Sequence, residues 1–123
     1  MQIIEAQKII TSVPTHARAA YAPEYENGSA YTQDDYRPIE QGVVPITDAG
    51  FIHADAAYDV VSASAGYMFR MQDHIKRFTA SCEKFGLQNP YSEDETVEIL
   101  NNMVRVTGLK DAYIWWAVTR GEA

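Results

Sequence analysis

Residues 47–86, TDAGFIHADAAYDVVSASAGYMFRMQDHIKRFTASCEKFG, contain the patterns that decide the fold class. Side chains alternate over Ala56–Ser64 in the way that is typical of a strand with two different faces. Ala65-Gly66 predicts a tight hairpin turn, after which the chain returns through Tyr67–Arg70. From Met71 onward the spacing of apolar residues changes to that of an amphipathic helix. The stretch therefore predicts a strand, a hairpin and a helix, in that order.

The helix expected over residues 71–85 carries an apolar stripe and a basic face. The stripe has spacings of three, four and three residues and consists of Ile75, Phe78, Cys82 and Phe85. Gly86 follows at the position of a C-cap glycine. His74 and Arg77 lie three residues apart on the opposite face. We therefore expect the stripe to pack inward and the basic pair to lie on the solvated side.

The flanking segments predict a hairpin, a helix and a strand. Ser29–Gln33 and Tyr36–Ile39 read as two strands joined by a short turn. A capping box that begins at Ser92 predicts a second amphipathic helix. Asp111–Arg120 reads as a mostly buried strand.

Together these elements predict an α+β fold. We expect a two-layer domain in which a mainly antiparallel sheet has two amphipathic helices packed on one face. The 123 residues suit one domain. We assign residues 28–123 to the small α+β domain and residues 1–27 to an N-terminal segment and arm.

The composition limits the classes of partner. A formal net charge of −7 argues against a nucleic acid or an anionic membrane surface, since both attract basic proteins. No apolar run approaches the ~20 residues of a membrane span. Cys82 is the one cysteine, so no internal disulfide can form, which fits a cytoplasmic protein. We also find no metal-ligand spacing, and expect no metal site.

Two basic residues are candidates for a binding site. Arg77 could bind a phosphate or carboxylate, because a guanidinium offers two parallel N–H donors to such an anion. It could equally be one residue of a solvated helix face. His53 follows a Gly-Phe turn and could be a pocket wall, a proton carrier or a hydrogen-bonded loop residue.

Two pairs of strand residues are further candidates. Tyr58 and Val60 are two residues apart, as are Tyr113 and Trp115, so each pair shares one strand face. The pairs belong either to the core beneath the helices or to the walls of a largely apolar pocket.

Four segments resemble the fold type IV (class IV) aminotransferases, which use pyridoxal 5′-phosphate (PLP). Residues 51–60, FIHADAAYDV, resemble the family's G-F-x-x-[SG/A]-D-x-x-[YF]-[DE]-V. Residues 66–78, GYMFRMQDHIKRF, resemble G-x-x-F-R-L-x-x-H-x-x-R-L, and residues 81–87 resemble its continuation. Residues 111–121 are similar to a strand that ends in T-R-G. The segments look most like the (R)-selective amine transaminases, with the D-amino-acid and branched-chain aminotransferases as close competitors.

The resemblance implies a PLP enzyme that moves an amino group between an amine or amino acid and a keto acid, and that acts as a homodimer. It implies that Arg77 holds the cofactor phosphate. It also implies a substrate pocket lined by His53, Tyr58, Val60, Tyr113 and Trp115. This chain has Trp115 where those amine transaminases often have glutamate, and Ser64 where they often have tryptophan, so its substrate range is open.

The same resemblance implies a Schiff-base lysine on a second, C-terminal domain that is absent from this chain. None of the four lysines matches that position: Lys8, Lys76, Lys84 and Lys110. We therefore expect no catalytic residue here and no transamination by the 123 residues alone. A PLP lyase of the same fold is one alternative. A non-catalytic interaction domain derived from this scaffold is another.

Overall fold

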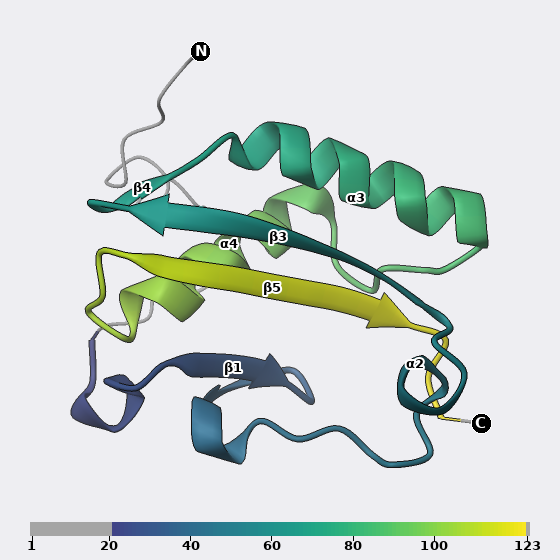
Figure 1. The fold of residues 1–123 in the computed structure, drawn as a ribbon, viewed down its shortest axis with the longest axis horizontal. Helices are drawn as coiled ribbons and strands as arrows, with labels where there is room; N and C mark the ends of the chain where they lie inside the picture. The colour runs from purple at the N-terminus through teal and green to yellow at the C-terminus, as the bar shows by residue number, and fades with distance from the viewer. Residues whose placement is uncertain (1–20, 123) are drawn as a thin grey trace.

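The computed structural model describes residues 21–122, which form a sheet backed by helices and a separate small hairpin (Figure 1). Most of the expected N-terminal segment therefore lies outside the described residues. In chain order the helices and strands are η1 Pro23–Tyr25, β1 Ser29–Thr32, β2 Asp35–Pro38, η2 Ile39–Gln41, α2 Ala49–Ile52, β3 Ala56–Ser64, β4 Tyr67–Met68, α3 Met71–Phe85, α4 Glu93–Arg105 and β5 Ala112–Thr119.

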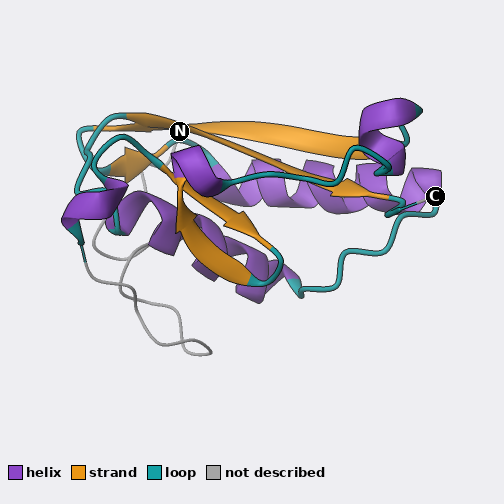
Figure 2. Ribbon diagram, turned by 90° about the horizontal axis from the view of Figure 1, so that it is seen from below, coloured by secondary structure: helices purple, strands orange, loops and turns teal. Residues whose placement is uncertain are grey.

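The main sheet has the order β4-β3-β5, and both pairings are antiparallel. β3 pairs with β5 along almost its whole length, whereas β4 pairs with β3 only at Ala63 and Ser64. The long helices α3 and α4 lie on one side of this sheet (Figure 2). β1 and β2 form their own two-stranded antiparallel sheet. The predicted α+β fold with two helices on one face of an antiparallel sheet is confirmed.

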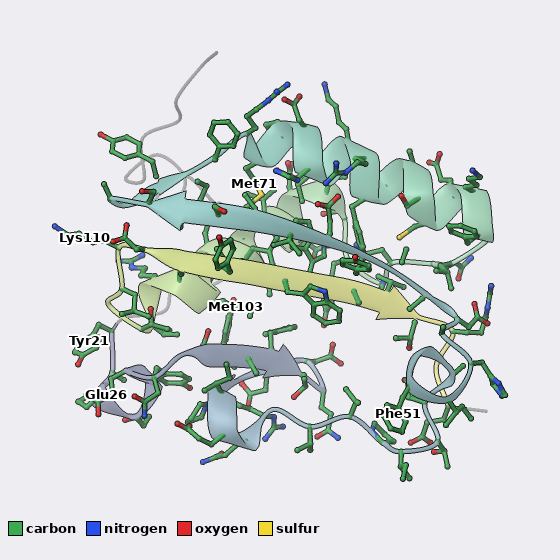
Figure 3. All side chains as sticks on the ribbon, viewed as in Figure 1. Tyr21, Glu26, Phe51, Met71, Met103 and Lys110 are labelled. Atoms are coloured by element: carbon green, nitrogen blue, oxygen red, sulfur yellow. The ribbon has the colours of Figure 1, made fainter. Side chains whose placement is uncertain are left out.

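The core lies between the main sheet and the two long helices. Met71, in the first turn of α3, points from the helix toward the sheet (Figure 3) and is almost fully buried. The buried residues around it are Val61, Ala63, Met68, Ile75, Leu100, Val104 and Ile114. A second cluster toward the other end of α3 consists of Ala57, Phe78, Cys82 and Leu87. Apolar area removed from water in this layer is what holds α3 and α4 on the sheet.

The predicted apolar stripe of α3 is wrong at its last member. Phe85 is 56% exposed, whereas Leu87 is buried in its place. Gly86 adopts a left-handed conformation with φ 66°, and the Leu87 N–H donates to the carbonyl of Cys82 at 2.9 Å. This C-terminal turn reverses the chain and brings Leu87 under the helix. Periodicity within the helix could not show that reversal.

The expectation that the last strand is mostly buried is also wrong. In β5, Ile114 is buried, but Tyr113 is 83% exposed and Trp115 is 59% exposed. The helices cover one face of the sheet, and alternate side chains on a strand point to opposite faces. Only one side of β5 therefore enters the core.

Two smaller differences concern turns. The predicted turn at residues 48–50 is the start of the short helix α2, in which the Asp48 side chain accepts a hydrogen bond from the Gly50 N–H at 2.7 Å. Gly50 lies so close to β5 that an added Cβ would be 2.5 Å from Thr119 Cγ2. The turn of the first hairpin is at Gln33 and Asp34, one residue earlier than expected, and both adopt positive φ.

Candidate functional site

Asp59 is the centre of a charged cluster between β3 and α3. Its carboxylate is only 2% exposed, because the alternation of β3 turns it toward the helix layer. Arg77 donates to it twice, from Nε to Oδ2 at 2.9 Å and from Nη2 to Oδ1 at 2.8 Å. His74 Nδ1 lies 2.9 Å from Oδ1, and the Val60 N–H donates to Oδ1 at 2.8 Å. The helix pair His74 and Arg77 is therefore anchored to the sheet.

Sequence reasoning did not identify Asp59 as a site residue, although a signal for it was present. The alternation over residues 56–64 places Asp59 on the same face as Val61 and Ala63, which is the buried face. A carboxylate on a buried face needs a cationic partner. The basic pair on the following helix was the obvious source of that partner.

The hydrogen bonds keep Asp59 ionised. Burial alone pushes the pKa of Asp59 up, but the hydrogen bonds from Arg77, His74 and the Val60 N–H outweigh it and hold the pKa at about 2. The same contact with Asp59 raises the pKa of Arg77. The pair is thus a true ion pair at neutral pH.

Arg77 keeps a donor surface that Asp59 does not use. Its side chain is 67% exposed, and its bonds to Asp59 come from Nε and Nη2. Among residues 21–122 its hydrogen bonds leave the Nη1 group unused. A fixed guanidinium with free N–H donors suits an oxyanion such as a phosphate monoester. The phosphate end of PLP fits this residue.

The opposite face of the sheet carries an exposed aromatic surface. Tyr58 and Trp115 stack with ring centroids 5.8 Å apart and an angle of 29° between their planes. Val60 is the cross-strand partner of Trp115, and Ser62 is the partner of Tyr113. The two predicted pairs therefore share one face, and that face points away from the helices. Of the two readings of these pairs, the buried core beneath the helices is excluded.

The predicted site residues fall into two groups that do not touch. Arg77 is on the helix side of the sheet, and the aromatic surface is on the other side. α3 runs alongside β3 (Figure 1), and β4 covers only the end of that edge of β3. One ligand could therefore reach both groups only around the edge of β3.

His53 lies apart from both groups, at the end of α2. It is the C-cap residue of that helix and is exposed. Phe51, on the same helix, is also exposed and lies at the end of the molecule where the described chain ends (Figure 3).

Arg120 fastens the loop after His53 to the end of α3. Its guanidinium donates to both oxygens of Asp55, from Nε and Nη2, each at 3.1 Å. It also donates to the carbonyls of Gly86 and Phe85, each at 2.9 Å. The hydrogen bonds from Arg120 lower the pKa of Asp55. A cation at these carbonyls also suits the negative end of the helix dipole.

Two searches of the described residues found no other kind of site. In residues 21–122, no group of three or more His, Cys, Asp or Glu is arranged to hold a metal ion. No described helix has the length and apolar character needed to cross a bilayer.

Comparison with known proteins gives relatives of one kind. The chain is 29% identical over 97 residues to a putative branched-chain-amino-acid aminotransferase of Methanocaldococcus jannaschii, a match that covers 79% of this chain and 32% of that protein. It is 35% identical over 82 residues to a D-alanine aminotransferase of Listeria monocytogenes, a match that covers 67% of this chain and 28% of that protein. The chain thus spans about a third of the length of these relatives.

Solved structures share the fold. A branched-chain amino acid aminotransferase of Escherichia coli superimposes with a TM-score of 0.71 at 18% identity, over 76% of this chain and 33% of that one. The branched-chain amino acid aminotransferase of T.th., complexed with N-(5′-phosphopyridoxyl)-L-glutamate, gives 0.71 at 21% identity, over 77% of this chain and 33% of that one. The family model for amino-transferase class IV matches residues 56–123. The chain belongs to the class IV aminotransferase family.

Proposed function

We propose that this chain is the N-terminal part of a PLP-dependent aminotransferase, and that Arg77 holds the phosphate of the cofactor. The observation that carries the proposal is the Arg77 guanidinium, fixed by the buried Asp59 yet two-thirds exposed, in a chain of the class IV family. The reaction would move an amino group between an amine or amino acid and a keto acid.

Each group of residues has a separate task in this proposal. Arg77 binds and orients the phosphate through charge-assisted hydrogen bonds. Tyr58, Val60, Tyr113 and Trp115 form an apolar wall that excludes water from the substrate, with His53 at its rim. Bound PLP supplies the electron sink that amino-group transfer needs. The lysine for that chemistry would come from a C-terminal domain that follows the small domain of residues 28–123.

Binding of pyridoxine 5′-phosphate tests the role of Arg77. This compound has an alcohol in place of the reactive aldehyde, so it forms no Schiff base with surface lysines. We expect Arg77→Ala to weaken its binding about ten- to hundredfold, because a charge-assisted hydrogen bond contributes about 1.5–3 kcal/mol. Lys76→Ala is the matched control on the same helix, since it removes an adjacent exposed cation. Calorimetry that gives equal affinities for Arg77→Ala and the unsubstituted chain would disprove the assignment.

The substrate class needs a second experiment. We propose the (R)-amine transaminase type because of the motif around His53, Tyr58 and Val60. D-amino-acid or branched-chain transamination is the second candidate, and the names of the relatives favour it. The polypeptide that carries the lysine domain should be given (R)-1-phenylethylamine, D-alanine and L-leucine as competing donors. The donor with the highest kcat/KM decides between them.

The remaining proposals concern the protein as a whole. We propose a cytoplasmic homodimer, and no transaminase activity for the 123 residues alone. Turnover of an amine and pyruvate by the purified 123-residue chain at enzymic rates would contradict the last point. If the coding sequence past Ala123 contains no lysine-bearing domain, the non-catalytic alternative gains support.

A further inference from the structure

We propose that Asp59 is a positioning residue, which holds the Arg77 guanidinium in one orientation so that its outer edge faces an incoming phosphate. The proposal deepens the proposed function and rests on it. Asp59 itself would not touch the ligand, because its carboxylate is 2% exposed and its oxygens already accept four hydrogen bonds.

The geometry of the Arg77 contact decides which donors remain. A guanidinium donates from Nε and from both protons on each Nη nitrogen. Asp59 takes the proton of Nε and one proton of Nη2, at 2.9 and 2.8 Å. Both protons of Nη1 and the second proton of Nη2 are left on the outer edge. This edge can bind a phosphate through two parallel bonds.

His74 fixes the carboxylate that fixes Arg77. His74 Nδ1 is 2.9 Å from Asp59 Oδ1 and 3.3 Å from Arg77 Nη2. An unprotonated Nδ1 would place its lone pair against an anionic oxygen at the shorter distance, which is repulsive. The proton therefore belongs on Nδ1, which donates to Asp59, and Nη2 only packs beside the ring. The Val60 N–H holds the same oxygen from the strand side.

Charge and orientation have opposite effects in this arrangement, and this makes the proposal testable. The negative charge of Asp59 opposes binding of an anion nearby, so a purely electrostatic view predicts that its removal tightens binding. Fixing a long side chain before binding has the reverse effect, because a free arginine loses rotamer freedom when it is immobilised. We infer that orientation dominates, since the carboxylate is buried and already paired with Arg77.

Calorimetric titration of the full 123-residue chain with pyridoxine 5′-phosphate, and separately with inorganic phosphate, tests this inference. Asp59→Asn should weaken binding about three- to tenfold, which corresponds to the ordering of one long side chain. Asp59→Glu keeps the carboxylate and should restore most of the affinity. Asp55→Asn is the matched control, because Asp55 also pairs with an arginine but lies away from Arg77.

The double variant separates positioning from general damage to the fold. If Asp59 acts through Arg77, Asp59→Asn should have no further effect on affinity when combined with Arg77→Ala. Additive losses, or binding by Asp59→Asn that is unchanged or tighter, would overturn the positioning role. If Arg77→Ala alone has no effect, the proposed function fails first, and the two failures are thereby distinguished.

A measurement on the unsubstituted chain covers the case in which Asp59→Asn does not fold. Nitrogen-15 NMR of the His74 ring reports which nitrogen carries the proton in the neutral form. The proposal requires the proton on Nδ1. A neutral ring protonated on Nε2 would mean that the Asp59–His74 bond is absent in solution, and the proposal would be wrong.

Discussion

Asp59 shows at the scale of single residues how a buried charge becomes useful. It lies on the core face of β3, where an unpaired carboxylate would be costly, and two side chains from α3 make it tolerable. The same contacts turn a mobile surface arginine into a fixed one. The residue therefore links the stability of the fold to the geometry of the candidate phosphate site.

The depressed pKa of Asp59 predicts a loss of stability in acid. A carboxyl with a folded-state pKa of about 2, below its ordinary value near 3.9, stabilises the fold fully above pH 4. This contribution disappears as the pH falls through about 2, and it is on the order of 2 kcal/mol. Urea unfolding at pH 5 and at pH 2.5 should show the loss.

Asp59→Asn is the comparison for this pH effect, because it has no carboxyl to titrate at that position. Its free energy of unfolding should be lower at neutral pH and should change less between pH 5 and pH 2.5. If both proteins lose the same free energy over this range, the acid sensitivity comes from other carboxylates.

At the scale of elements, the hairpin between β3 and β4 carries backbone strain. Ala65 has φ 51° and Gly66 has φ 84°, so both turn residues have positive φ. A left-handed conformation costs a residue with a Cβ about 1 kcal/mol, whereas glycine adopts it freely. We expect Ala65→Gly to raise the free energy of unfolding by about 0.5–1 kcal/mol, measured by urea denaturation.

Ala63→Gly is the matched control for that hairpin. Ala63 is two residues earlier, in the extended conformation and buried in the core. Glycine at this position should destabilise, because it adds unfolded-state entropy and removes packing. Equal effects at the two positions would show that the turn is not strained.

Arg120 is the corresponding device for α3 and its neighbours. It connects the end of β5 to Asp55 and to the last carbonyls of α3. We expect Arg120→Ala to speed hydrogen exchange of the Leu87 amide, which bonds to Cys82 across the helix end. Arg120→Lys keeps the charge but not the planar fork, so it should restore little protection. Full protection in Arg120→Ala would show that Gly86 alone secures this helix end.

At the scale of the whole molecule, the sheet has one covered face and one open face. Trp115 and Trp116 are adjacent in β5, and they sample the two sides. Trp115 is 59% exposed and stacks on Tyr58, whereas Trp116 packs on Phe78 with ring centroids 5.6 Å apart. An aromatic surface of this kind is typical of a binding site or an interface.

Single-tryptophan variants test this sidedness, since the chain has two tryptophans. With Trp116→Phe, the remaining Trp115 should emit at long wavelength and be quenched readily by acrylamide. With Trp115→Phe, the remaining Trp116 should emit at shorter wavelength and be protected. If Trp115 is the protected one in the isolated chain, the open face is covered in solution, for example by self-association.

Local patterns in the sequence were enough for much of the fold. The limits of β3 and α3, the C-cap at Gly86 and the capping box at Ser92 follow from side-chain period and from hydrogen bonds within a few residues. The pairing of residues on strand faces was also predictable, because it needs only the alternation of a strand. The class IV family was visible from motif spacing over the same segments.

Tertiary structure alone decided which strand face is covered and where each charge is paired. Sequence period shows that Tyr58 and Asp59 point opposite ways, but not that the helices choose the side of Asp59. The Asp59–Arg77 contact joins residues 18 positions apart, and Arg120 reaches Asp55 across 65. The physical reason is range: period and capping act within one element, whereas burial and ion pairing depend on which elements the folded chain brings together.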